Sequence, residues 1–308
     1  MDLVDAGRLA AGVALLSAAS VQDWRTRLVS DRIWVALGSV GLALIAAEAF
    51  LTGLPPEHLL ILVPAAVLFY TTFYGEELLT EEGWHFRPVR IGLFAAAAGA
   101  LVLEGYLLVP RSGANALLFF RDLTIPAMIL LGLGFYMTGL LHGGADLKAL
   151  MAITLITPLY PALAGLPLTP MDPRLAPALE TLFPFSLAVL TNAALLFVVS
   201  PIAMVAVNVR RGTVRFPHAL FGYLVPIDRV PRFAWLMERM EGGRRRHQLL
   251  PRRTDDRRET LDGLLAAGAK DVWVIPQIPF IIPMTIGFVV GFVFGNVLLS
   301  LMSLGLSR

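Results

Sequence analysis

Residues 141–148, Leu-His-Gly-Gly-Ala-Asp-Leu-Lys, decide how this chain folds, because they place a carboxylate between two apolar runs, 124–141 and 151–157. An ionisable side chain between long apolar segments is costly to remove from water, so Asp146 predicts a functional site. Asp23 stands in a comparable place, after one apolar run and before another that begins at Ile33. Two aspartates at the ends of hydrophobic helices predict a pair of carboxylates at the edge of a membrane.

The composition indicates an integral membrane protein. The chain has 308 residues, of which 56% are hydrophobic and 16% are charged, and its mean hydropathy is +0.71. A soluble chain of this length carries about 25% charged residues. The absence of cysteine excludes disulfides, thiolate zinc sites and cysteine nucleophiles. No small-residue cleavage site follows the first apolar run, so we expect that run to be a retained helix.

Apolar windows of about 20 residues predict membrane-spanning helices. We expect an all-α polytopic membrane protein of about eight such helices, with a basic soluble region before the last one. The expected domains are a helical membrane domain over 1–207, a soluble region over 208–275 and a C-terminal transmembrane helix over 276–308. The apolar windows are 6–22, 32–52, 58–74, 91–110, 124–142, 146–164, 183–207 and 277–302.

The basic residues predict which side of the membrane each loop faces. Residues 208–275 hold 14 of the 25 Lys and Arg residues but only 8 of the 23 Asp and Glu residues. Such loops stay in the cytoplasm. In an eight-span chain the shorter segments 23–31, 75–90 and 142–148 share that side. We therefore expect both aspartates at the cytoplasmic face of the cell membrane. The alternative for each is a helix-terminal residue solvated among the lipid headgroups.

Arginine is concentrated within the soluble region, at 244–246, 252–253 and 257–258. A run of this kind on the cytoplasmic side predicts contact with anionic membrane lipids. No aromatic side chains are interleaved with it, so nucleic acid is not an expected partner.

Two neighbouring carboxylates can hydrolyse an amide. They cannot both ionise cheaply, so one keeps its proton near neutral pH and the pair titrates as a unit. The ionised member takes a proton from a water held between them, and the protonated member hydrogen-bonds the scissile carbonyl. Gly143, Gly144 and Ala145 fit beside such a pair because small residues let backbones approach closely, including an extended substrate.

Several stretches resemble the type IV prepilin peptidases. Residues 23–34, Asp-Trp-Arg-Thr-Arg-Leu-Val-Ser-Asp-Arg-Ile-Trp, resemble their first-aspartate motif, and Gly143-Gly144-Ala145-Asp146-Leu-Lys148 resembles their second, Gly-x-Gly-Asp with a following Lys. Residues 221–228, 235–238 and 272–283 resemble the C-terminal region of the archaeal preflagellin peptidases. The resemblance implies a membrane aspartyl endopeptidase whose catalytic pair is Asp23 and Asp146. It implies precursors of flagellins or type IV pilin-like proteins as substrates, cut after a short basic leader.

The chain departs from the family pattern in three ways. Ala145 stands where the general motif has Gly. The two aspartates lie 123 positions apart, which suggests that the helices over 58–110 are an inserted pair. Bacterial relatives carry a cysteine-rich metal-binding segment and an N-methyltransferase activity, and without cysteine we expect neither here. His142 has no second His or Cys nearby at metal spacing. The sequence thus predicts no cofactor and no metal ligand.

Other polar residues have a structural and a functional interpretation. Lys148 either reaches the membrane interface or tunes the aspartates. Ser30 and Asp31 predict a helix N-cap, Glu48 and Glu104 predict interfacial residues, and Asn192 predicts a hydrogen bond between helices. For the whole chain, the alternative to a peptidase is a transporter or channel that uses Asp23 and Asp146 as a cation or proton site. An assembly scaffold with a peptidase-like fold is a third possibility, and the oligomeric state is not predicted.

Overall fold

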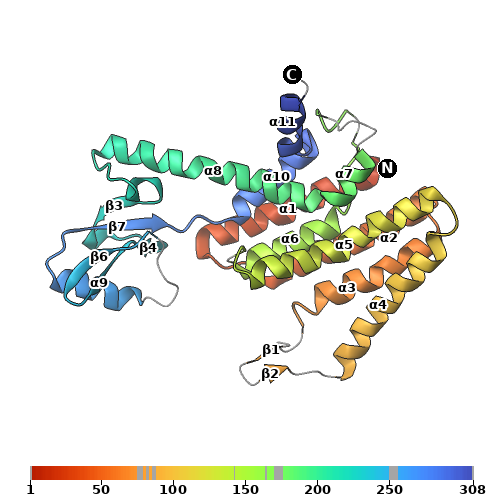
Figure 1. Ribbon diagram of the computed structural model, residues 1–308, viewed down its shortest axis with the longest axis horizontal. Coiled ribbons are helices and arrows are strands. Elements are labelled where there is room, and N and C mark those ends of the chain that lie inside the picture. Colours follow the sequence, from red (N-terminus) through yellow and green to blue (C-terminus); the bar gives the residue numbers. More distant parts are fainter. Residues whose placement is uncertain are drawn as a thin grey trace. The chain divides into compact units, whose positions relative to one another are not determined.

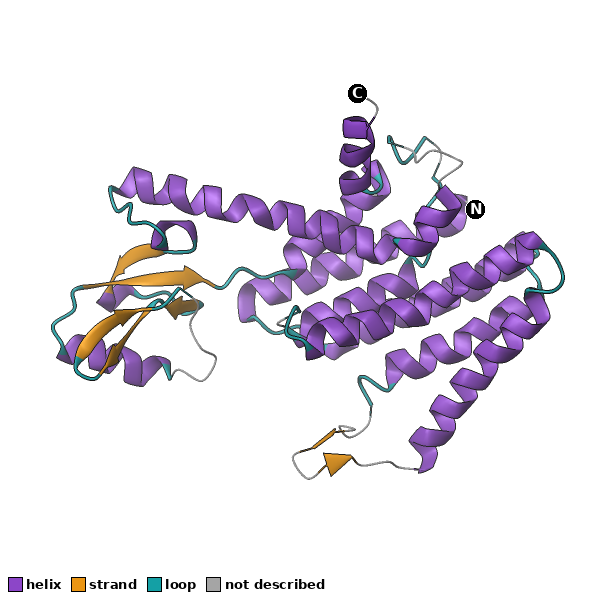
Figure 2. Ribbon diagram, in the orientation of Figure 1, coloured by secondary structure: helices purple, strands orange, loops and turns teal. Residues whose placement is uncertain are grey.

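The computed structural model describes residues 2–74, 79–80, 83–84, 88–141, 143–163, 165–169, 176–249 and 256–306. The chain is mostly helical, at 69% (Figure 2). It divides into two compact units, Met1–Ala193 with Pro279–Arg308, and Ala194–Ile278.

The first unit is a bundle of helices (Figure 1). Within it α2 packs along α6, α1 along α10, α3 along α4 and α5 along α6. Its elements are α1 (Asp2–Thr26), α2 (Asp31–Thr52), the 3₁₀ helix η1 (Pro56–Ile61), α3 (Leu62–Tyr70), β1 (Leu79–Thr80), β2 (Gly83–Trp84), α4 (Pro88–Leu108), α5 (Gly113–Met137), α6 (Gly144–Ile156), α7 (Ala176–Leu182), the beginning of α8 (Phe185–Arg211), α10 (Ile281–Phe294) and α11 (Val297–Leu306).

The helix ends follow from local chemistry. Ser30 and Ser112 are N-caps whose hydroxyls accept hydrogen bonds from the backbone N–H groups of Arg32 and Asn115. Helix α2 ends at Gly53, whose φ of 66° suits glycine. The expected cap before the second span is therefore confirmed at Ser30, while Asp31 is the first helical residue.

Helix α6 is the centre of the helical core. Nearly all of its residues from Leu147 to Ile156 are buried. A side chain at Gly41 of α2 would come within 2.5 Å of the backbone of Leu155, so α2 and α6 touch almost backbone to backbone. This close approach positions α6, and with it the Asp146 segment at its N-terminus, against α2.

Eight full-length spans are not confirmed. Within the described residues, five helices are long and apolar enough to cross a membrane: Leu3–Thr26, Asp31–Thr52, Pro88–Leu108, Gly113–Met137 and Phe185–Arg211. The expected third span is divided between η1 and α3. The sixth ends at Ile156, just before Pro158, which lacks the N–H needed to continue a helix. The eighth is broken at Gly295, whose φ is 75°, into α10 and α11.

The expected all-α class is not confirmed either, because the second unit contains a small sheet. Strands β3 (Tyr223–Pro226), β7 (Asp271–Pro276) and β4 (Ala234–Leu236) form an antiparallel sheet in the order β3-β7-β4. These strands are short and lie among charged residues in the sequence. No apolar window of the sequence therefore marks them. The remaining elements of this unit are the rest of α8, η2 (His218–Leu220), η3 (Ile227–Arg229), the hairpin β5 (Glu238–Glu241) and β6 (Arg244–His247), and α9 (Arg257–Ala266).

Candidate active site

Asp23 lies in the last turn of α1 and is only 8% exposed. Its carboxylate accepts a hydrogen bond from the backbone N–H of Ile281, the first residue of α10, and interacts electrostatically with Arg27. The N-terminus of a helix carries a partial positive charge that stabilises a carboxylate. Asp23 is therefore held in place by a segment more than 250 positions away in the sequence.

Asp146 is the third residue of α6, and Gly143 is the N-cap of that helix. The Asp146 carboxylate folds back to accept a hydrogen bond from the Gly143 backbone N–H, as an acidic residue does at this position of a capping box. A Cβ atom on Gly143 would lie 2.6 Å from Oδ2 of Asp146. Glycine is needed here for space, since its φ of −103° is open to any residue.

The other two small residues of the motif differ from Gly143. A Cβ atom on Gly144 would meet nothing within 4 Å, and Gly144 is exposed. Ala145 is half-buried and packs against the helical core. Gly144 is thus the motif position with free space around it.

The structure brings Asp23 and Asp146 close enough for their carboxyl charges to interact. One stands at the end of α1 and the other at the beginning of α6, and each accepts a backbone N–H group from a helix start. Two carboxyl groups whose charges interact do not ionise independently of each other.

Lys148 does not point simply toward the membrane interface. Its ammonium group donates a hydrogen bond to Oδ1 of Asp31 at 2.6 Å and lies 5.2 Å from the ring centroid of Phe73. The ion pair joins the start of α2 to α6, two residues after Asp146. Its side chains are partly exposed, and such a pair contributes only about 0–1 kcal/mol to stability. Its value lies in orientation.

The sequence alone did not assign two groups of this site. These are the backbone N–H of Ile281 and the guanidinium of Arg27. Residues 272–283 stood out in the sequence only as a family-like stretch, and a backbone donor leaves no mark in residue type. Arg27 has a φ of 59°, a left-handed conformation uncommon for a side chain of its size. His142, beside the motif, lies outside the described residues.

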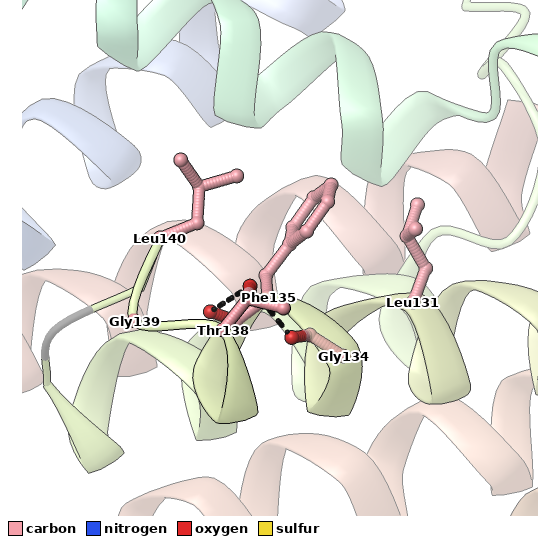
Figure 3. Close-up of a pocket in the computed structure, with 6 residues that line it drawn as sticks. All are labelled: Leu131, Gly134, Phe135, Thr138, Gly139 and Leu140. Carbon is pink, nitrogen blue, oxygen red and sulfur yellow. Dashed lines mark hydrogen bonds between the residues drawn. The ribbon is translucent and has the colours of Figure 1, made fainter.

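An apolar groove lies on the last turns of α5, immediately before the motif in sequence. It has a volume of about 530 Å³. Figure 3 shows the side chains of Leu131, Phe135 and Leu140 projecting to one side of this segment. The Thr138 hydroxyl donates hydrogen bonds to the carbonyl oxygens of Gly134 and Phe135. The described side chains that line the groove therefore offer no free polar group.

Three polar side chains within the helical bundle, those of Asn192, Glu48 and Glu104, have defined partners or burial in the structure. Asn192 does link helices, because its side chain donates to the carbonyl of Gly295 and accepts from the N–H of Val297, so that prediction is confirmed. Glu48 is half-buried and paired with Arg8 at 2.6 Å. The interfacial prediction for Glu104 is wrong, since its side chain is completely buried in the protein.

Comparison with protein families identifies the C-terminal part of the chain. Residues 214–297 match the family model described as Archaeal Peptidase A24 C-terminus Type II. The match supports the assignment to the archaeal prepilin/preflagellin peptidases that the sequence motifs predict. No curated protein matches the chain. The matched residues include Ile281, so the family region itself contributes the backbone donor at Asp23.

Proposed function

We propose that this protein is a membrane aspartyl endopeptidase that removes the short basic leader peptide from preflagellin or type IV pilin-like precursors. The observation that carries the proposal is the pairing of Asp23 and Asp146, each hydrogen-bonded to a backbone N–H and each within reach of the other's charge. The match to an archaeal peptidase family supports the same activity. The chain contains no cysteine, and we propose that it lacks N-methyltransferase activity.

In the proposed mechanism the two carboxyl groups share one proton. Asp23 also receives the positive charge of Arg27 and the partial charge of the α10 N-terminus. We therefore assign the ionised form to Asp23, which takes a proton from the attacking water. Asp146 donates its proton to the scissile carbonyl as the water oxygen bonds to the carbonyl carbon. The tetrahedral species then collapses as Asp23 passes its acquired proton to the leaving amine and one hydroxyl of that species returns a proton to Asp146. Gly144 gives the extended substrate backbone room to approach.

We further propose that the chain crosses the cell membrane about eight times, with the Asp23–Asp146 pair, called the dyad below, at the cytoplasmic face. The excess of Lys and Arg in 208–275 supports this orientation. In this arrangement 1–207 is the membrane domain, 208–275 is cytoplasmic and 276–308 returns to the membrane. Helices α3, α6 and α10, which are short for a full span, supply the extra crossings together with the segments that follow or precede them.

Cysteine labelling tests this topology, because the chain has no cysteine of its own. Ala114→Cys, at the start of α5, is expected to react only from outside the cell. Asp262→Cys, on the exposed face of α9, is expected to react only after the membrane is permeabilised. Both positions are exposed, so accessibility to an impermeant maleimide reports the side of the membrane. Labelling of both from the same side would refute the eight-span arrangement.

Only part of the arginine-rich run is available for anionic lipids. Arg244 and Arg246 are exposed on β6, and we propose them as lipid contacts, although Nε of Arg246 also lies 3.3 Å from a carboxylate oxygen of Glu241. Arg257 is used inside the second unit, where its guanidinium donates to the carbonyl oxygens of Val230 and Pro231. Arg245 binds the buried carboxylate of Glu238. Arg252 and Arg253 lie outside the described residues.

The catalytic proposal is tested by co-expression with a preflagellin and by assay of the purified chain in detergent. Asp23→Asn and Asp146→Asn are each expected to lower cleavage by at least about 1,000-fold, because neither half of the pair works alone. Asp262→Asn, an exposed aspartate of α9, is the matched control and is expected to cleave normally. Cleavage in detergent needs no ion gradient, so it distinguishes a peptidase from the alternative transporter. Substantial turnover by either dyad variant would exclude the mechanism.

A further inference from the structure

A second cluster of titratable side chains lies in the first unit, away from the dyad. It joins His58 of η1, Glu104 of α4 and Asp122 of α5, whose nitrogen and oxygen ligand atoms all lie within 4.8 Å of one another. All three residues are at most 5% exposed. Asp122 lies 15 residues before the end of α5, which is about 22 Å along the helix. The cluster is therefore a different site from the Asp146 motif that follows α5.

The Glu104 carboxylate lacks a donor. Among the described residues, no N–H or O–H group reaches either of its oxygens, and the group that faces it is a second carboxyl, Asp122. Oδ2 of Asp122 is hydrogen-bonded to Nδ1 of His58, at a distance of 2.6 Å. Burying two carboxyl groups against each other without a donor is expensive unless a proton or a cation lies between them.

The surrounding charges do not balance the cluster. Glu48 is close enough to act electrostatically on Asp122, and it is paired with Arg8. The same Arg8 also binds Asp5 at 2.9 Å. One arginine thus serves two carboxylates, and His58 is the one further basic group that the described contacts bring to Glu104 and Asp122. With Glu104 and Asp122 both ionised, the buried region has an excess of negative charge that a divalent cation would largely offset.

We propose that His58, Glu104 and Asp122 bind a divalent transition-metal ion of the zinc class. An imidazole nitrogen with two carboxylate oxygens is a ligand set that Zn²⁺ accepts, whereas Mg²⁺ and Ca²⁺ prefer oxygen ligands alone. Zinc holds such ligands at about 2.0–2.2 Å, so binding draws the three side chains slightly closer. The proposal departs from the expectation, based on the sequence around His142, that the chain has no metal ligand.

The position of the site indicates a structural role. Its ligands come from three separate elements, and two of them belong to the segment 58–110 that the motif spacing suggests is inserted. A metal ion would fasten η1 and α4 to α5. The site therefore stabilises the attachment of the inserted helices and takes no part in peptide hydrolysis.

The full chain, purified in detergent, provides the test. After incubation with ZnCl₂ and removal of free metal, elemental analysis is expected to find about one zinc per wild-type chain. Cobalt is expected to give a visible absorption band that zinc abolishes by competition. These measurements on the wild-type chain alone decide the proposal even if a variant fails to fold. A wild-type chain that retains no zinc and gives no cobalt band would show that the two carboxyl groups share a proton instead.

Variants then assign the ligands. Glu104→Gln and Asp122→Asn keep the side-chain shapes, and His58→Gln replaces the imidazole by an amide. Each is expected to weaken zinc binding by at least about 10-fold to 100-fold. Glu57→Gln is the matched control, because Glu57 neighbours His58 but pairs with Arg111. It is expected to bind zinc normally. If folded Glu104→Gln binds zinc as tightly as the wild type, the assignment is overturned. Zinc content is measured without substrate, so this result is independent of the proposed peptidase activity.

Discussion

Two places in the helical unit bring a pair of carboxyl groups together, and their surroundings differ. At the dyad, Asp23 and Asp146 each accept a backbone N–H group at the beginning of a helix. At the second cluster, Glu104 faces Asp122 with no donor among the described residues, and His58 completes the set. The first arrangement stabilises a charged carboxylate. The second supports a bound cation.

The largest expected effect tests whether the two aspartates of the dyad act together in catalysis. Asp23→Glu and Asp146→Glu keep the charge but move the carboxyl group by about an ångström, which is expected to lower kcat by roughly 100-fold. The double Asn variant is expected to be no worse than either single Asn variant, since the two residues act together. Measured kcat values that multiply, as for independent sites, would contradict a shared mechanism.

The glycines of the motif give the next effect and a built-in control. Gly143→Ala places a Cβ atom 2.6 Å from Oδ2 of Asp146 and must displace that carboxylate. We expect kcat to fall by about 10-fold to 100-fold, since a displacement of an ångström is sufficient. Gly144→Ala meets no atom within 4 Å and is expected to leave folding and kcat unchanged, with any loss confined to KM.

Equal losses of kcat in Gly143→Ala and Gly144→Ala would show that the motif is needed for backbone freedom generally. The space beside Asp146 would then not be the reason for glycine at position 143. Thermal unfolding of both variants separates this outcome from a general loss of stability.

The smallest expected effect separates the two carboxyl sites directly. A chelator such as EDTA is expected to leave the initial rate of cleavage unchanged, because the dyad mechanism contains no metal. The same treatment is expected to lower the Tm of the chain by a few degrees, as loss of a structural ligand does. Added zinc should restore the Tm. Inhibition of the initial rate that zinc reverses would mean that a metal takes part in hydrolysis.

Much of this molecule could be predicted from residue types and their order. The apolar windows predict a membrane protein, and they locate the helices that the structure describes at 2–26, 31–52 and 88–108 to within about four residues, whereas α5 begins at Gly113, well before its window. The charge of residues 208–275 sets them apart from the rest of the chain. Asp23 and Asp146 stand out in the sequence because each is a carboxylate between apolar runs, where an ionised group is costly to bury.

The interruptions of the expected spans were harder to predict. Pro158 is visible in the sequence, and α6 ends at Ile156, just before it. The break at Gly295 depends on a left-handed turn that a single glycine permits but does not require. The sheet of the second unit was missed because short strands carry too little periodicity to be recognised beside long hydrophobic helices.

The sequence by itself determined the membrane character, the candidate catalytic pair and the family resemblance of this protein. Only the tertiary structure decided which groups surround each carboxyl. The N–H of Ile281 at Asp23, the space required at Gly143 and the burial of Glu104 between helices all depend on segments that are distant in sequence or on backbone geometry. The type of a residue is enough to show that burying its charge is costly. The donor or cation that offsets this cost depends on how distant segments pack around it.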